Sequence, residues 1–122
     1  LGVSMAVCRA GAVSKNKPLW SYIREISNQN LPKESFPTPC FNVINGGVHA
    51  NSKLDVQEFF IIPQRPEFAK NLEIAAETYH WLGSRLKNKF GFLAANIGDE
   101  GGFVPPFEKT AEVLDFILET LN

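Results

Sequence analysis

Apolar residues in the first 27 positions recur with helical spacing, and a proline-rich stretch follows them. The segment from Leu1 to Ser14 is mostly small and apolar, which predicts a closely packed helix weakened by two glycines. Pro18 suits the first turn of a second, amphipathic helix that ends near Ser27. Three prolines and two asparagines interrupt residues 28–39, so this stretch predicts a connector and a domain boundary.

Beyond the connector, short apolar runs alternate with longer stripes of helical period. The runs Cys40–Asn45, Val56–Ile62 and Phe92–Ile97 each stop at glycine or proline, and each predicts a strand. Pro66 opens a long helix and another helix follows the last strand, so the order is strand, strand, helix, strand, helix. This α/β order fits either part of an α/β barrel or a small open sheet. The helical stripes consist of Phe68, Leu72, Ala75, Tyr79, Leu82 and Leu86, and of Val113, Leu114, Ile117, Leu118 and Leu121.

Charge and composition exclude several classes of protein. Twelve lysines and arginines stand against 13 acidic residues, so there is no basic excess for a nucleic-acid partner. No apolar run approaches the roughly 18–20 residues of a membrane span, and we expect no membrane partner. Two separate cysteines, Cys8 and Cys40, favour a reducing, cytoplasmic location. The sequence opens on Leu1 and its last residues still follow a helical pattern, so we expect a fragment of a longer protein.

Polar side chains gather in two glycine-rich segments that each follow an apolar run. One segment spans residues 45–50 and leads to Gln57 and Glu58, and the other spans residues 98–102 and contains Glu100. In α/β barrels, catalytic side chains project from the ends of strands. Glu100 can serve as a proton donor if burial or a second carboxylate, such as Glu58 on an adjoining strand, keeps it protonated. The alternative is a solvated acid beside glycine in a turn.

For two further residues, the residue type and its surroundings allow more than one role. Glu58 lies in an otherwise apolar strand, so it either faces solvent or has polar partners. His49 lies in a glycine-rich loop, where it is an exposed residue, a proton donor or a contact to a phosphate group. Phosphate-loop, zinc-helix and nucleophile-elbow motifs are absent from the sequence, so no residue of this chain is assigned to a metal.

Several strings of residues, taken in order, closely resemble the enolase family, and the likeness covers essentially the whole chain. The resemblance implies a small N-terminal α+β domain followed by an α/β barrel. Residues 1–35 would be the last helices of the first domain and a linker, and residues 36–122 the opening part of the barrel. The strings are Leu1–Ala12, Phe41–Gly47, His49–Ala50, Gln57–Phe59 and Asn96–Phe103.

The resemblance also implies a reaction, the glycolytic interconversion of 2-phosphoglycerate with phosphoenolpyruvate and water. In the family a lysine base removes the proton at C2, magnesium ions hold the resulting enolate, and a glutamic acid protonates the departing C3 hydroxyl. Glu100 matches that acid, and Glu58 matches the second glutamate beside it. Gln57 and Glu58 would line the substrate pocket, and His49 matches the histidine of a loop that closes over the substrate.

The family's lysine base and its acidic magnesium ligands lie downstream of this chain in the enolase pattern. We therefore expect a magnesium-dependent lyase, and a homodimer, only in the full-length protein, and no activity from this chain alone. An opened barrel exposes strand edges, so we expect the chain to be stable only within a larger assembly. The alternatives are a non-catalytic, enolase-derived structural or interaction protein and a related enzyme that acts on a different acid.

Overall fold

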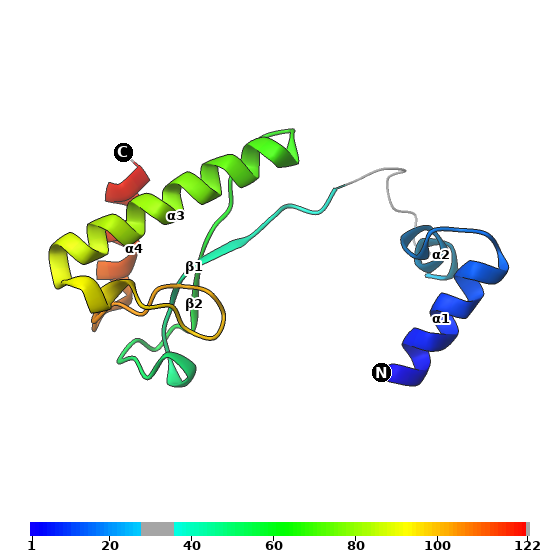
Figure 1. Ribbon diagram of the computed structural model, residues 1–122, viewed down its shortest axis with the longest axis horizontal. Helices are drawn as coiled ribbons and strands as arrows, with labels where there is room; N and C mark the ends of the chain where they lie inside the picture. The colour runs from blue at the N-terminus through cyan, green and yellow to red at the C-terminus, as the bar shows by residue number, and fades with distance from the viewer. Residues whose placement is uncertain (28–35, 122) are drawn as a thin grey trace. The chain divides into compact units, whose positions relative to one another are not determined.

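The computed structural model describes residues 1–27 and 36–121, apart from the side chain of His49. Most of the predicted connector, residues 28–35, lies outside the described residues. The chain divides into two compact units, Leu1–Ser35 and Phe36–Asn122 (Figure 1). Each unit is described by itself below.

The first unit contains the two helices that the sequence predicts. Helix α1 spans Gly2–Ser14 and helix α2 spans Leu19–Ile26, with Pro18 immediately before its first turn. The two helices touch at Gly11, where an added Cβ would lie 2.6 Å from Cζ of Tyr22. Glycine at this position therefore allows the close approach between the helices.

The second unit begins with a two-stranded antiparallel sheet. Strand β1 spans Phe41–Asn45 and strand β2 spans Glu58–Ile61, so both are shorter than predicted. Asn45 pairs with Glu58 at one end of the sheet, and a bulge between Asn42 and Ile44 interrupts the register. The end of β1 and the start of β2 therefore lie together, and this end carries the polar residues.

The predicted strand at residues 92–97 is wrong, because Phe92–Ala95 forms the 3-10 helix η2. Gly91, at φ 90°, ends the preceding helix α3, which spans Phe68–Phe90. The next turn closes at once, since the Ala94 N–H donates to the Gly91 carbonyl at 3.1 Å. A short apolar run fits a tight turn as well as a strand, and periodicity does not separate them.

A single residue, Phe103, takes the place of the missing strand. It forms a parallel bridge with Ile44 of β1 and an antiparallel bridge with Ile97. Its N–H donates to the Val43 carbonyl, and its carbonyl accepts from the Asn45 N–H, both at 2.9 Å. The loop between the bridged residues, residues 98–102, is thereby fixed beside the end of β1.

The core lies between the sheet, α3 and the last helix, α4, which spans Thr110–Leu121 and packs beside α3 (Figure 1). The predicted stripes are only partly buried. On α3, Phe68 and Leu72 remain nearly half exposed, and on α4 the buried face includes Phe116, which the stripe omitted. Each stripe is wider than the surface that this unit offers to cover it. About half exposed on α4 are Leu114, Leu118 and Leu121; buried in the core are Val43, Ile44, Leu54, Phe59, Ile61, Ala75, Leu82, Leu86, Ala94, Phe103, Phe107, Val113, Phe116 and Ile117.

None of the helices formed by residues 1–27 and 36–121 has the length and apolar character needed to cross a membrane.

Candidate functional site

The site is organised around Asn45, the last residue of β1. Its side chain is buried, with 4% of the residue exposed, on the sheet face opposite to Ile44. Its Oδ1 accepts a hydrogen bond from the Gly102 N–H at 2.7 Å, and its Nδ2 donates to Oε2 of Glu100 at 3.0 Å. One amide group thus ties the end of the strand to both the backbone and the acid of the 98–102 loop.

Glu100 is held by a second amide, from the residue that precedes the other strand. Nε2 of Gln57 donates to Oε1 of Glu100 at 2.9 Å, so each carboxyl oxygen accepts one amide hydrogen bond. Gln57 immediately precedes β2, and Asn45 ends β1, so two adjacent segments of the sheet converge on one acid. The sequence led us to expect a carboxylate as the neighbour of Glu100, whereas its hydrogen-bond donors are two carboxamides.

The loop that carries Glu100 is closed at its base and turned by glycine. The Gly98 N–H donates to the Gly102 carbonyl at 2.8 Å, and Gly101 has φ 85°, which favours a residue without Cβ. Gly102 also has no room for a side chain, because an added Cβ would lie 2.5 Å from Oδ1 of Asn45. The glycines of this segment therefore serve both the turn and the close contact with Asn45.

Helix α3 supports the loop from a third side through Tyr79. The Tyr79 hydroxyl donates to the Gly101 carbonyl at 2.8 Å, and its ring stacks on Phe103 with centroids 4.3 Å apart. Burial raises the pKa of Tyr79, so the hydroxyl keeps its proton and remains a donor. Gly83, one turn further along α3, leaves room for the Phe103 ring, since an added Cβ would lie 2.7 Å from Phe103 Cζ.

Glu58 lies on the same side of the sheet as this network. It is the direct antiparallel partner of Asn45, and such partners point to the same face. Glu58 is half-buried, and no side chain among the described residues forms a hydrogen bond or an ion pair with its carboxyl group. The structure thus brings Gln57 and Glu100 into direct contact and sets Glu58 beside Asn45 without joining it to Glu100.

His49 belongs by its backbone to the 3-10 helix η1, Val48–Ala50, and its side chain lies outside the described residues. The next residue, Ala50, lines a shallow pocket together with Asn45, Asp99 and Glu100, and this pocket is too small to enclose a water molecule. The loop that follows is tied down by an ion pair between Lys53 and Glu108, which lowers the pKa of Glu108. The predicted histidine loop therefore borders the pocket of Glu100.

The described residues contain no group of three or more His, Cys, Asp or Glu side chains that is arranged to hold a metal ion. Glu100 and Glu58 do not form such a group with a third ligand. A magnesium ion bound near this pocket would need ligands from outside the described part of the chain.

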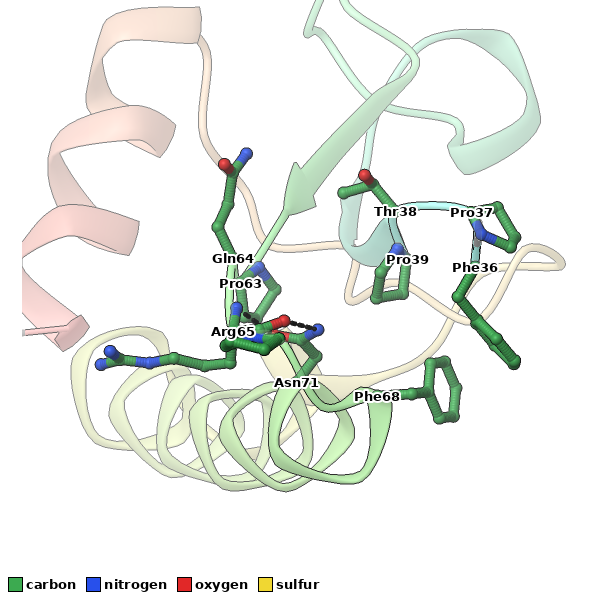
Figure 2. A pocket seen from close by; sticks show the side chains of 10 residues that line it. Phe36, Pro37, Thr38, Pro39, Pro63, Gln64, Arg65, Phe68 and Asn71 are labelled. Atoms are coloured by element: carbon green, nitrogen blue, oxygen red, sulfur yellow. Dashed lines mark hydrogen bonds between the residues drawn. The ribbon is translucent and has the colours of Figure 1, made fainter. Parts of the chain in front are cut away.

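A larger hollow of about 360 Å³ lies at the opposite end of the two-stranded sheet (Figure 2). Asn71, buried at the start of α3, holds the segment behind this hollow through hydrogen bonds to the Arg65 N–H and carbonyl. Figure 2 shows the Arg65 side chain pointing away from Phe36 and Phe68. This hollow offers packing surface and lacks the convergent polar groups of the Glu100 pocket. Its lining consists of Phe36, Pro37, Thr38, Pro39, Pro63, Gln64, Arg65, Pro66, Phe68 and Asn71.

Sequence reasoning did not select Asn45 or Tyr79 as site residues. Asn45 carried a signal, because it is the polar end of an apolar run and is followed by two glycines. Tyr79 carried none, because it lies within a helical stripe, where core packing is the simplest role for an aromatic residue. Its hydroxyl contact depends on where the 98–102 loop lies in space.

Comparisons with known proteins identify the family to which the sequence belongs. The family model described as "Enolase, C-terminal TIM barrel domain" matches residues 33–122. The protein named enolase in Eimeria tenella is 44% identical over 123 aligned residues, and the one in Mastigamoeba balamuthi is 48% identical over 123. Both alignments cover 100% of this chain and 28% of the relative, so the chain spans little more than a quarter of their length. The resemblance found in the sequence is thereby confirmed, and the chain belongs to the enolase family.

Proposed function

We propose that this chain is the segment of an enolase that supplies the general acid, Glu100. In this proposal the full-length protein interconverts 2-phosphoglycerate with phosphoenolpyruvate and water. The observation that carries the proposal is that Asn45 and Gln57 hold Glu100 through both of its carboxyl oxygens, at the end of the sheet where β1 stops. These two contacts fix the position of the carboxyl group, and proton transfer depends on geometry before acid strength.

Glu100 would act at the leaving group. After a base has removed the proton at C2, Glu100 gives its proton to the C3 hydroxyl. The C3–O bond then breaks and water leaves with its electron pair, while the former C2–H electrons form the C2–C3 double bond. The hydrogen bond of Gln57 to Oε1 is exposed, whereas that of Asn45 to Oε2 is partly buried, so Oε1 is the oxygen that would face the substrate. Glu58 and His49 would contact the substrate from β2 and the η1 loop.

The base and the metal ligands would come from the remainder of the full-length protein. Magnesium, when bound, supplies positive charge that stabilises negative charge developing on the substrate carboxylate. Residues 1–35 would belong to the N-terminal enolase domain and residues 36–122 to the start of the barrel. A homodimer in the cytoplasm is proposed for the full-length enzyme on family grounds.

The test compares two isosteric variants in the full-length enolase that contains this segment. Glu100→Gln removes the acidic proton and keeps the size of the side chain, whereas Asp99→Asn makes the same change at the preceding residue, which lines the same pocket. We expect Glu100→Gln to lower kcat by roughly 10²–10⁴-fold with KM within a few-fold of wild type. Asp99→Asn should stay near wild type. Equal turnover of Glu100→Gln and wild type would remove Glu100 from the acid role, and an inactive wild type would favour the non-catalytic alternative.

A further inference from the structure

We propose that Asn45 is a positioning residue that holds Glu100 in place for proton transfer, through an amide whose orientation is set by the Gly102 backbone. This inference rests on the proposed function of Glu100. Asn45 itself would touch no substrate atom, and it would act through the acid.

The two hydrogen bonds of Asn45 permit only one orientation of its amide group. Oδ1 accepts from the Gly102 N–H, which cannot act as an acceptor. The NH₂ group must therefore face Glu100, where it donates to Oε2. Rotating the amide by 180° would set its oxygen against a carboxyl oxygen and its NH₂ against an N–H, and both hydrogen bonds would be lost.

Asn45 is also fixed in space on several sides. Its own N–H donates to the Phe103 carbonyl at 2.9 Å, so its backbone is part of the bridge that closes the loop. Its side chain sits close to two glycines, since added Cβ atoms at Gly98 and Gly102 would lie 3.3 and 2.5 Å from Oδ1. A side chain enclosed in this way holds its partner more firmly than an exposed one.

Gln57 is a different kind of partner. It precedes β2 in an exposed loop, and its hydrogen bond to Oε1 lies at the surface. In this proposal the hydrogen bond from Asn45 is kept throughout the reaction. The hydrogen bond from Gln57 is displaced, because an entering substrate can take the place of an exposed amide. Oε2 of Glu100 would then keep its hydrogen bond from Asn45. Oε1 would carry the proton and donate it to the leaving hydroxyl.

The charged and titratable groups around Glu100 come from three elements. Glu58 lies across the sheet as the partner of Asn45, Asp99 precedes Glu100 in the loop, and Tyr79 of α3 reaches the neighbouring Gly101 carbonyl. The side chain bonded to Oε2 is the neutral amide of Asn45. A substitution that changes this one group from donor to acceptor therefore has a defined electrostatic consequence.

Asn45→Asp makes that change in the full-length enzyme. It keeps the oxygen that accepts from Gly102 and replaces the NH₂ group with a second carboxylate oxygen facing Glu100. Because two adjacent carboxylates cannot both ionise cheaply, a proton would be retained between them at higher pH. We expect the pH at which kcat falls to half on the alkaline side to rise by at least about one unit.

The matched control is Asn71→Asp at the far end of the sheet. Asn71 has the same 4% exposure and also uses its amide oxygen and nitrogen in two hydrogen bonds, but to the Arg65 backbone. This control loses stability for the same structural reasons and should leave the pH profile unchanged. Asn45→Ala serves as the second variant. We expect kcat to fall by about tenfold or more and KM to stay within twofold of wild type, since misplacement of a catalytic group alone can lower the rate this much.

The outcomes separate this inference from the proposed function. If Asn45→Asp has the pH profile of wild type, or if it does not fold and Asn45→Ala retains wild-type kcat, the positioning role is overturned. Glu100→Gln measured in parallel tests the acid itself. Loss of turnover in Glu100→Gln together with an unchanged Asn45→Asp profile would reject only the positioning role, whereas full turnover in Glu100→Gln would reject the proposed function.

Discussion

Gly102→Ala tests the contact on which the candidate site depends. The added Cβ would lie 2.5 Å from Oδ1 and 2.9 Å from Cγ of Asn45, and 2.8 Å from Oδ1 of Asn42. To reach ordinary van der Waals contact, the Asn45 oxygen has to retreat by about 0.9 Å. Because the Asn45 backbone is bonded to Phe103, the side chain must rotate, and rotation breaks its bonds to the Gly102 N–H and to Glu100.

The magnitude follows from two costs. A buried amide left without partners costs about 1–3 kcal/mol, and overpacking a closed site costs about 1–3 kcal/mol more. Gly98→Ala is the matched control, because its Cβ would lie 3.3 Å from the same oxygen and 3.2 Å from Cγ2 of Val104, so small shifts relieve it. Both substitutions reduce the entropy of the unfolded chain in the same way, and that effect cancels in the comparison.

The assay is urea unfolding of the two variants in the full-length protein. If the dependence of the unfolding free energy on urea concentration is the same in both, the difference between their urea midpoints reports the difference in stability. We expect Gly102→Ala to be less stable than Gly98→Ala by at least about 2 kcal/mol, and to lose more turnover. Equal stability of the two variants would refute the view that the loop is held against Asn45.

Two further predictions concern the η1 loop and the chain by itself. Lys53 lowers the pKa of Glu108, so their ion pair is fully present above the ordinary carboxyl pKa of 4.5 and is lost as the pH falls through the lowered value. Hydrogen exchange of the Leu54 amide in the full-length protein should therefore be slower in wild type than in Lys53→Met at pH 7. At acid pH the exchange rates of the two proteins should converge. A difference in rate that does not depend on pH would contradict this. The isolated 122-residue chain should show no magnesium-dependent turnover in a coupled assay, since the proposed base and metal ligands belong to the remainder of the full-length protein, and measurable turnover would overturn that expectation.

Local signals in the sequence predicted most elements of the fold. Pro18 marks the start of α2, and the apolar run that ends at Asn45 marks β1, because proline and glycine act on their immediate neighbours. The run at residues 92–97 was misread, since an apolar tetrapeptide fits a 3-10 turn as well as a strand. Which face of α4 is covered depends on what packs against it, and the sequence of α4 alone does not contain that information.

The candidate site also combines features that local sequence signals predict with features that depend on distant parts of the chain. Glu100 and Gln57 were accessible from the sequence because polar residues beside glycines stand out in apolar surroundings. Their contact, and the part played by Asn45, depend on the antiparallel pairing of β1 and β2 and on the Phe103 bridge. These are long-range pairings that no local pattern specifies. The roles of Glu100, Gln57, Glu58 and His49 stay predictions.

The most direct test of the account asks which step of the reaction fails when Glu100 loses its proton. Full-length Glu100→Gln is incubated with 2-phosphoglycerate in deuterium oxide, and NMR follows deuterium entry at C2 beside the formation of phosphoenolpyruvate. The account predicts that deuterium still enters at C2, because the base is intact, while dehydration falls by about 100-fold or more. Dehydration at the wild-type rate, or an equal loss of exchange and dehydration, would contradict the assignment of Glu100 as the acid that protonates the leaving group.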